Sequence, residues 1–246
     1  MRRKISIGVT LVTFASVWTL ALLLPPFDVS YAASAWQAAK QDREHDVVVY
    51  TRKLDNGDTE FKGITHVRSS LSGCVALLRD VDTMPKWVDR TVMAKVLHRV
   101  SDTEVFAYNV TRMDTPFTDR DAIVHSVLQQ DPDTFVVTIK GEGLQEYQGA
   151  TMYDYKSNEH NYVRIAKVES SWRFAPQDKG MVEVTFQGSG DPGGNMSNPV
   201  FKWFIGFAIW RSPYETLKNM HNLIGNKKYQ NATLPFIKEP SGDTRS

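Results

Sequence analysis

The side chains that carry out most enzymatic chemistry are present in this sequence, but they do not occur at the spacings that a reaction requires. The six histidines are scattered, and no two of them form an HxH or HExxH pattern of the kind that ligates a metal ion. There is no GxSxG motif, and the single cysteine, Cys74, has no catalytic partner in the sequence. The sequence therefore predicts no catalytic residue, no metal and no cofactor.

Two short motifs allow a functional and a structural interpretation. The run Asp119-Arg120-Asp121 could be acid/base machinery, or a salt-bridge cluster that pins the turn after Pro116, and the second interpretation is favoured. Leu71-Ser72-Gly73-Cys74 mimics a bacterial lipidation box, but such a box must directly follow the export signal, which here lies roughly forty residues earlier. We interpret Cys74 as a small apolar helix residue.

Composition excludes some classes of function. The chain has 246 residues, 41% of them hydrophobic and 23% charged, which suits one globular domain with a sizeable core. The 29 basic residues almost balance the 28 acidic ones, whereas a nucleic-acid-binding protein usually carries a basic excess. We expect no nucleic-acid partner.

The N-terminus indicates export. Arg2-Arg3-Lys4 precede an uncharged run from Ile5 to Leu24, and small residues follow in Ser30–Ala32 and Ala33–Ala35. This pattern is typical of a secretory signal, although the run is also long enough for a membrane anchor. Residues 1–35 are therefore predicted as a signal peptide or an anchor. Either puts the rest of the chain in the periplasm or outside the cell, tethered if the helix is not cleaved.

The first part of the exported region predicts strands mixed with short helices. The segment Trp36–Glu44 has the pattern of a short amphipathic helix, and Asn56-Gly57 supplies a hairpin turn. Leu71, Val75, Leu78 and Val81 recur at helical spacing. We expect strands at Val47–Arg52 and Phe61–Val67 and a second helical segment at Met84–Val88.

The middle of the chain predicts an antiparallel meander. Its expected strands are Val92–Val100, Thr103–Met113, Ala122–Gln130, Thr134–Lys140, Tyr162–Phe174 and Met181–Gly188. Gly141–His160 is a longer loop that carries apolar residues, which indicates a lid over an entrance rather than a passive linker.

The last helix is predicted to be buried. Asp191–Gly194 breaks the chain, and the following segment, Asn198–Trp210, is apolar nearly all round. Such a helix must be buried on several sides, and clamping it across a curved sheet would leave an apolar pocket. A more amphipathic continuation passes through Leu217 and Ile224. The domain is expected over residues 36–228, followed by a polar tail over 229–246.

Several separated motifs together resemble the START (StAR-related lipid-transfer) domain. They are Val49–Arg52, Trp87, Pro116–Asp121, Tyr162–Arg164, Trp172–Pro176 and Asp191–Gly194. The resemblance covers roughly Trp36 to Lys228 and is strongest to bacterial members without enzymatic appendages. It implies an α+β helix-grip fold, similar to START and Bet v 1 proteins: a curved antiparallel sheet around a long C-terminal helix.

The resemblance also implies which strand faces line the cavity. These are the faces of Ala122, Val124, Ser126 and Leu128, of Val105, Ala107, Asn109 and Thr111, and of Val168, Ser170 and Trp172. The hydrophobic pattern alone would instead put Phe106, Tyr108 and Val110 inside. We follow the family. The full set of expected ligand-binding residues is Met84, Trp87, Val105, Ala107, Asn109, Thr111, Val124, Ser126, Tyr147, Met152, Val168, Ser170, Trp172, Phe186, Met196, Phe201, Phe204, Ile205 and Ala208.

Departures from the family bear on the class of ligand. Cholesterol-type members carry a buried Glu/Arg pair where this sequence has Asn109 and Ser126, and Met84 replaces the arginine that grips phosphate in phosphatidylcholine transfer. A neutral cavity suits a hydroxyl or carbonyl group, since burying a phosphate without a cation is prohibitive. The expected ligand is one sterol-, hopanoid- or fatty-acyl-like lipid with a neutral head group.

The sequence thus predicts a monomeric lipid-binding or lipid-shuttling protein that meets a membrane surface transiently and is not an enzyme. Two alternatives remain open. The first is an enzyme of the polyketide cyclase/aromatase type, which would need a titratable residue on the cavity wall. By the family's face assignment no such residue is expected, and His125 is expected to point outward. The second is an interaction module of an envelope complex, docking through the apolar helix.

Overall fold

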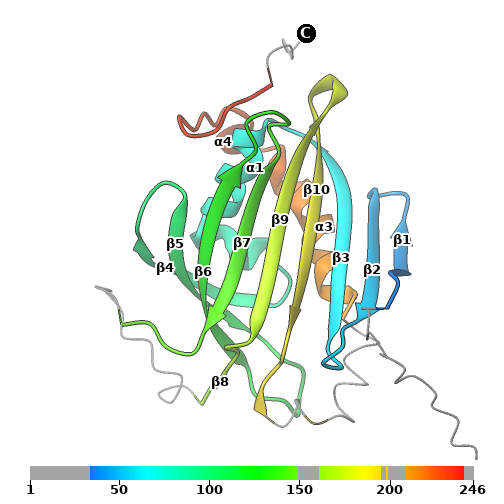
Figure 1. Cartoon of the computed structure of the whole chain (residues 1–246), viewed down its shortest axis with the longest axis vertical. Coiled ribbons are helices and arrows are strands. Elements are labelled where there is room, and N and C mark those ends of the chain that lie inside the picture. The colour runs from blue at the N-terminus through cyan, green and yellow to red at the C-terminus, as the bar shows by residue number, and fades with distance from the viewer. Residues whose placement is uncertain (1–33, 149–160, 195–197, 199–208, 241–246) are drawn as a thin grey trace, which may run out of the picture. The chain divides into compact units, whose positions relative to one another are not determined.

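One antiparallel sheet organises the protein, and helices cover one of its faces (Figure 1). A computed structural model describes residues 34–148, 161–194, 198 and 209–240. The chain divides into two units, Met1–Tyr31 and Ala32–Ser246, and the described residues all belong to the second. Residues 1–33 of the predicted signal or anchor lie outside them. None of the helices within the described ranges has the length and hydropathy of a membrane-spanning segment.

The described strands form a single path with order β1-β2-β3-β10-β9-β7-β6-β5-β4, and β8 pairs with β6. Their bounds are β1 Gln37–Asp42, β2 Val47–Lys53, β3 Thr59–Arg68, β4 Thr91–Arg99, β5 Glu104–Thr111, β6 Arg120–Gln130, β7 Val137–Leu144, β8 Val163–Arg164, β9 Val168–Gln177 and β10 Met181–Gly190. The helices are α1 Leu71–Arg79, η1 Val81–Lys86, η3 Asp178–Gly180, α3 Arg211–Ile224 and α4 Lys227–Gln230. The predicted α+β helix-grip class is confirmed, and α3 is its C-terminal helix.

The first element departs from the prediction. The segment expected as a helix over Trp36–Glu44 is instead strand β1, which pairs antiparallel with β2. Its residues, Gln-Ala-Ala-Lys-Gln-Asp, favour a helix by propensity and are mostly exposed. They carry little hydrophobic pattern, so pairing with the edge of β2 decides their conformation.

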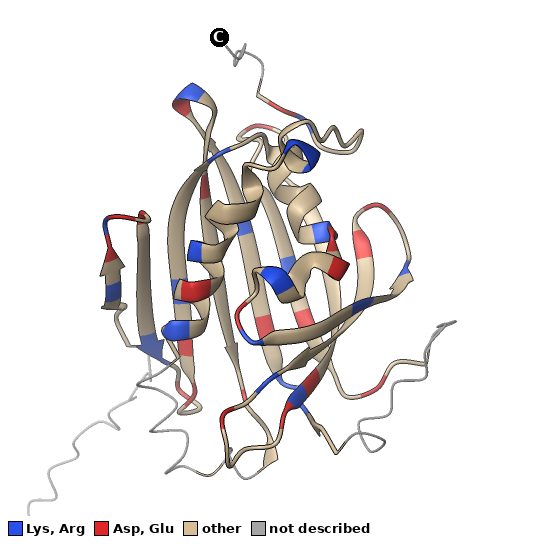
Figure 2. Cartoon of the chain, turned by 180° about the vertical axis from the view of Figure 1, so that it is seen from behind, with Lys and Arg blue, Asp and Glu red and all other residues tan. Residues whose placement is uncertain are grey.

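Helix α3 defines the covered face of the sheet. A Cβ atom built on Gly63 of β3 would lie 2.6 Å from a methyl carbon of Leu217, so the glycine allows the helix to approach closely. Two residues along β3, the Thr65 hydroxyl lies 2.7 Å from Nε2 of His221. We call this side of the sheet the helix face and the opposite side the outer face; Figure 2 shows α1 and α3 lying over the helix face.

Helix α1 joins the same core. Ser70 accepts a hydrogen bond from the amide of Gly73 as N-cap, and the Glu239 carboxylate accepts from the amides of Leu71 and Ser72 at 3.0 and 2.8 Å. Cys74 is fully buried in this helix, and burial raises the pKa of its thiol to about 12. The interpretation of Cys74 as an apolar helix residue is therefore confirmed.

The folded part continues past Lys228, where the sequence ended the domain. Tyr229 and Ile237 are 2% and 7% exposed and belong to the main core. The side chain of Gln130 on β6 donates to the carbonyl of Lys238 and accepts from its amide. The sequence did not reveal that this segment packs against the core, because its apolar residues are surrounded by polar ones.

Two predicted segments in the second half have different bounds. Strand β7 continues to Leu144, so the expected loop does not begin at Gly141. Gly141 and Gly143 suggest a loop by composition, but a Cβ on Gly143 would lie 2.6 Å from a methyl of Val168, and glycine there permits close packing between strands. The expected strand Tyr162–Phe174 is divided into β8 and β9. Residues 149–160 of the expected lid, and most of the expected helix Asn198–Trp210, lie outside the described residues.

Candidate ligand-binding face

The helix face carries small side chains across its middle strands. One cross-strand row of paired residues runs Val105, Ser126, Gly141, Ser170, Gly188, Phe61. A Cβ on Gly141 would lie 2.7 Å from the hydroxyl of Ser170 and 3.5 Å from that of Ser126. Two hydroxyls therefore flank a bare backbone at the centre of this row.

Large side chains fill the neighbouring row of the same face. It runs Leu128, Ile139, Trp172, Phe186, Gly63. The Trp172 and Phe186 rings stack with centroids 4.1 Å apart, and Phe61 meets Phe186 edge-on at 4.9 Å. Trp87, which follows η1, meets Trp172 edge-on at 5.7 Å. These contacts join η1 to the sheet in one aromatic strip, which forms an apolar floor beside the small residues.

Asn109 holds one of two buried polar atoms on this face that lack a partner among the described residues; the other is Nε1 of Trp87. It pairs across the strands with Ala94 on β4 and Ala122 on β6. Its side-chain oxygen is buried and has no hydrogen-bond partner in the structure described here. An unsatisfied buried carbonyl costs about 1–3 kcal/mol, so such a group in a native protein needs an explanation. A bound molecule that donates a hydrogen bond would supply the missing partner.

Asn109 and Ser126 do not form a pair. They lie on adjacent strands and on the same face, but Asn109 is opposite Ala122, four residues from Ser126 along β6. At about 3.3 Å per residue this separates the two positions by about 13 Å. The expectation that both contact one polar group of a ligand is therefore wrong. Ser126 belongs instead with Ser170 beside Gly141.

The outer face of the same strands has a core of its own. Leu97, Tyr108, Val110 and Ile123 are buried there. Asp121 is fully buried, and its two oxygens accept from Nε and Nη2 of Arg164 at 3.0 and 2.8 Å. The Tyr108 hydroxyl donates to the same carboxylate, and burial together with the Asp121 charge raises the tyrosine pKa. Every charge in this cluster has a partner.

Arg120 completes this arrangement through backbone contacts. Its guanidinium donates to the carbonyls of Pro192 and Gly193 at 3.0 and 3.2 Å, and to that of Thr118. Gly193 and Gly194 have φ of +71° and +57°, which glycine adopts without strain. The structural interpretation of Asp119–Asp121 is confirmed, although Arg120 binds carbonyls and Asp121 pairs with Arg164 rather than with a neighbour in sequence.

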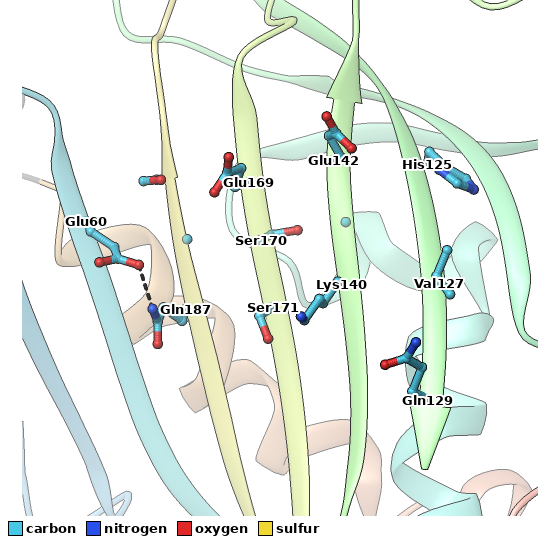
Figure 3. Close-up of a pocket in the computed structure, with 13 residues that line it drawn as sticks. Glu60, His125, Val127, Gln129, Lys140, Glu142, Glu169, Ser170, Ser171 and Gln187 are labelled. Carbon is cyan, nitrogen blue, oxygen red and sulfur yellow. Dashed lines mark hydrogen bonds between the residues drawn. The ribbon is translucent and has the colours of Figure 1, made fainter. Parts of the chain in front are cut away.

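The outer face also holds an open polar groove of about 650 Å³ (Figure 3). Glu142 and Glu169 pair directly across β7 and β9, and His125 pairs with Glu142 across β6 and β7. Nε2 of His125 lies 2.8 Å from a Glu104 oxygen. Within the described residues no group of three or more His, Cys, Asp or Glu could hold a metal ion. A groove lined by charges does not suit a lipid.

No protein-family model matches the chain. An uncharacterized protein of Pseudomonas aeruginosa is 24% identical over 192 residues, which are 77% of this chain and 87% of that protein. Among solved structures, a STAR-related lipid transfer protein from Xanthomonas axonopodis superposes with a TM-score of 0.66 at 23% identity, over 78% of this chain and 100% of that one. The chain has the START fold.

Human START proteins agree with this assignment. STARD10 gives a TM-score of 0.60 at 14% identity, covering 76% of this chain and 74% of its own. StAR-related lipid transfer protein 5 gives 0.59 at 13% identity, covering 76% and 86%. The sequence resemblance to START proteins is confirmed at the level of the fold.

Within the START fold, most of the expected ligand-binding residues share the helix face. The cross-strand pairs put ten of them there: Val105, Ala107, Asn109, Thr111, Val124, Ser126, Val168, Ser170, Trp172 and Phe186. Met84 and Trp87 come from η1 and the residue that follows it. Met152, Met196, Phe201, Phe204, Ile205 and Ala208 lie outside the described residues. Phe61 was not expected, although it begins the alternation Phe61, Gly63, Thr65, Val67 on β3.

Tyr147 is on the wrong side for the role predicted. Its ring stacks on Phe106 at 4.3 Å, and its hydroxyl lies 2.7 Å from Nδ1 of His98. Phe106 pairs with His125 across β5 and β6, on the outer face. Tyr147 therefore covers the outer core. Its aromatic character reflects that packing and not contact with a ligand on the helix face.

The family resemblance and the hydrophobic pattern assigned opposite faces of β5 to the interior. This conflict is resolved because β5 is covered on both faces. Tyr108 and Val110 are 1% and 0% exposed, as the pattern indicates, but they lie opposite the helix face. Ala107 and Asn109 take the helix face, as the family implies. A strand buried on both sides has no polar face, so alternation alone could not distinguish them.

Proposed function

We propose that this protein binds one lipid with a small neutral polar group between the helix face of its sheet and the elements that cover it, and carries or senses that lipid outside the cytoplasm. The observation that carries the proposal is the buried, unpaired oxygen of Asn109. Lipid binding or transfer is also what the named START neighbours suggest.

The side chains around this oxygen favour an apolar ligand. Ala107, Val124 and Val168 continue the helix face beside the Ser126–Gly141–Ser170 row, and Trp172 with Phe186 closes one end. Burying apolar ligand surface contributes about 25 cal/mol per Å². One or two hydrogen bonds then suffice to orient the ligand.

The same face argues against a charged head group. On the described strands from β2 to β10 no Asp, Glu, His or Lys side chain lies over its middle rows, and the guanidinium of Arg120 is bound to carbonyls at the sheet end. A phosphate buried there would lack a cation, at a cost of several kcal/mol. A hydroxyl that donates to the Asn109 oxygen meets no such penalty, so a sterol-like or hopanoid-like alcohol, or an acyl lipid with a neutral head, fits best.

A cyclase-type enzyme is the less favoured function. General acid–base catalysis needs a titratable side chain within hydrogen-bond reach of the substrate. On β5 to β7 and β9 the described candidates Glu104, Asp121, His125, Glu142 and Glu169 all occupy outer-face register positions. The described strands of the helix face offer amide and hydroxyl groups, which hold a ligand without moving protons at neutral pH. His221 reaches the margin of this face from α3, where its Nε2 lies 2.7 Å from the Thr65 hydroxyl.

The test uses two sterols that differ by one hydroxyl, cholesterol and cholestane, titrated into wild-type protein and Asn109→Leu. Leucine is similar in volume and accepts no hydrogen bond. We expect cholesterol affinity to fall by about 1–3 kcal/mol, which is about 5- to 150-fold, because its hydroxyl loses the buried acceptor. Cholestane affinity should change little, since it never used that contact.

The matched control is Asn222→Leu, the same substitution at an exposed position of α3. It should leave both affinities unchanged. Equal losses of both sterols in Asn109→Leu would mean that the effect is steric and that Asn109 is no anchor. If wild-type protein retained neither sterol, and native mass spectrometry of the purified chain showed no lipid carried along, lipid binding itself would be refuted.

A further inference from the structure

Cation–π contacts gather at one edge of the sheet. Of the eight such contacts among the described residues, six lie along the edge formed by β1, β2 and β3. Three lie on the outer face of that edge, around Trp36 and Tyr50, and three lie on the helix face, at the start of α3. Arg52 and Lys62 both lie 4.5 Å from the ring centroid of Trp36. Lys40 lies 5.2 Å from that of Tyr214 and 6.0 Å from that of Trp210. Basic positions on β1, β2 and α3 are visible at this edge in Figure 2.

Two of these cations are electrostatically available. Arg52 is bonded to Glu60 at 2.6 Å, and so its charge is compensated. For Lys40 and Lys62, no carboxylate of the described chain lies within ion-pair distance. Trp36, Trp210 and both lysines are partly exposed. We call Trp36, Lys40, Lys62 and Trp210 the basic edge.

The basic edge adjoins the point where the N-terminal segment joins the folded unit. The Ser34 amide donates to the carbonyl of Lys53 at 3.1 Å, and the Lys53 amide donates to the Ser34 hydroxyl at 2.8 Å. Only nine residues separate Ser34 from Leu24, the end of the uncharged run. Fully extended, they span at most about 35 Å. When that run is inserted in a bilayer, the chain therefore keeps Ser34 close to the surface.

We propose that the basic edge docks the folded unit onto a lipid surface that carries anionic head groups. Tryptophan and lysine suit this boundary, because an apolar body meets the acyl region while the polar end stays among the head groups. Each lysine near an anionic surface strengthens binding about fivefold. This inference extends the proposed lipid binding by giving the orientation of the folded unit on the membrane. In that orientation β1 to β3 and the start of α3 face the membrane.

The experiment is hydrogen exchange, followed by mass spectrometry, on the full chain in nanodiscs. Discs of phosphatidylcholine alone are compared with discs that also contain phosphatidylglycerol. We expect exchange of the β1 and β2 amides to slow when phosphatidylglycerol is present. In Lys40→Gln/Lys62→Gln the docked-to-free ratio derived from that slowing should fall by about 25-fold, and high salt should have the same effect on wild type.

The control is Lys140→Gln/Lys227→Gln, which removes two exposed lysines away from the basic edge. It should retain the wild-type response. Unchanged exchange in β9 and β10 of every variant shows that the fold is intact. Equal exchange of β1 and β2 in the two kinds of disc would overturn the proposal. An equal fall of the docked-to-free ratio in the control pair would show that net charge alone causes the effect. That result would also overturn the proposal.

Discussion

Tyr108 and Asn109 are neighbours on β5, yet the hydroxyl of the first is hydrogen-bonded and the side-chain oxygen of the second is not. The Tyr108 hydroxyl faces the outer side and joins the closed set of Asp121 and Arg164. The Asn109 oxygen lies toward the helix face, buried and unpaired. A closed polar network stabilises a fold, whereas an open group raises its free energy until a partner arrives. Reactive-looking residues such as Asp119–Asp121 thus serve structure here, and a plain amide marks the candidate site.

The largest effect is expected where the outer network is broken. Asp121→Ala leaves the buried Arg164 charge uncompensated, because the Arg164 side chain is only 8% exposed. We expect the free energy of unfolding to fall by about 3–5 kcal/mol, measured by urea denaturation of lipid-free protein. Asp114→Ala, which removes a 78% exposed partner of Arg90, should cost less than about 1 kcal/mol. Similar losses in the two variants would show that the Asp121 pair is no special support.

A smaller effect should come from a titratable group at the margin of the helix face. Burial lowers the pKa of His221, which lies 2.7 Å from the Thr65 hydroxyl and faces Asp46 and His45. The unfolded chain therefore binds a proton more readily, so this contribution is complete above about pH 6.5 and is lost as pH falls through the folded pKa. The free energy of unfolding should drop less between pH 7 and pH 5 in His221→Gln than in wild type. Identical pH slopes would exclude His221 as the cause.

The smallest expected change in stability is the one that distinguishes the helix face from the outer face most clearly. Asn109→Leu removes a polar group that has no protein partner, so the lipid-free protein should lose almost no stability and can gain some. The free energy of unfolding should not fall by more than about 0.5 kcal/mol, and it can rise because the cost of the unpaired carbonyl is removed. A loss approaching that of Asp121→Ala would mean that Asn109 supports the fold, and the contrast between the faces would disappear.

The sequence predicted most of the fold because its strands carry period-two patterns and clear turns. It failed at β1, where six mostly exposed residues take their conformation from pairing with β2. It also ended β7 too early, because Gly141 and Gly143 look like loop residues until the packing of Ser170 and Val168 against them is seen.

The sequence could predict which strand faces form the candidate site, but not how the residues of β5 and β6 align with one another. The family resemblance assigned Asn109 and Ser126 to one face, which the strand pairs bear out, but no local pattern reveals that they are four residues apart across β5 and β6. Tyr147 was misplaced for a related reason. An aromatic residue after a strand can cover either face, and only the contacts with Phe106 and His98 decide between them.

The hydrogen bonds from the start of α1 to the Glu239 carboxylate determine when this helix can be completed as the chain is synthesised. The amide of Leu71 and its acceptor are 168 residues apart in the chain, so the first turn of α1 stays incomplete until Glu239 has emerged. Closing so long a loop is entropically costly and slow. The nascent chain must therefore reach Glu239 before this part of the core locks.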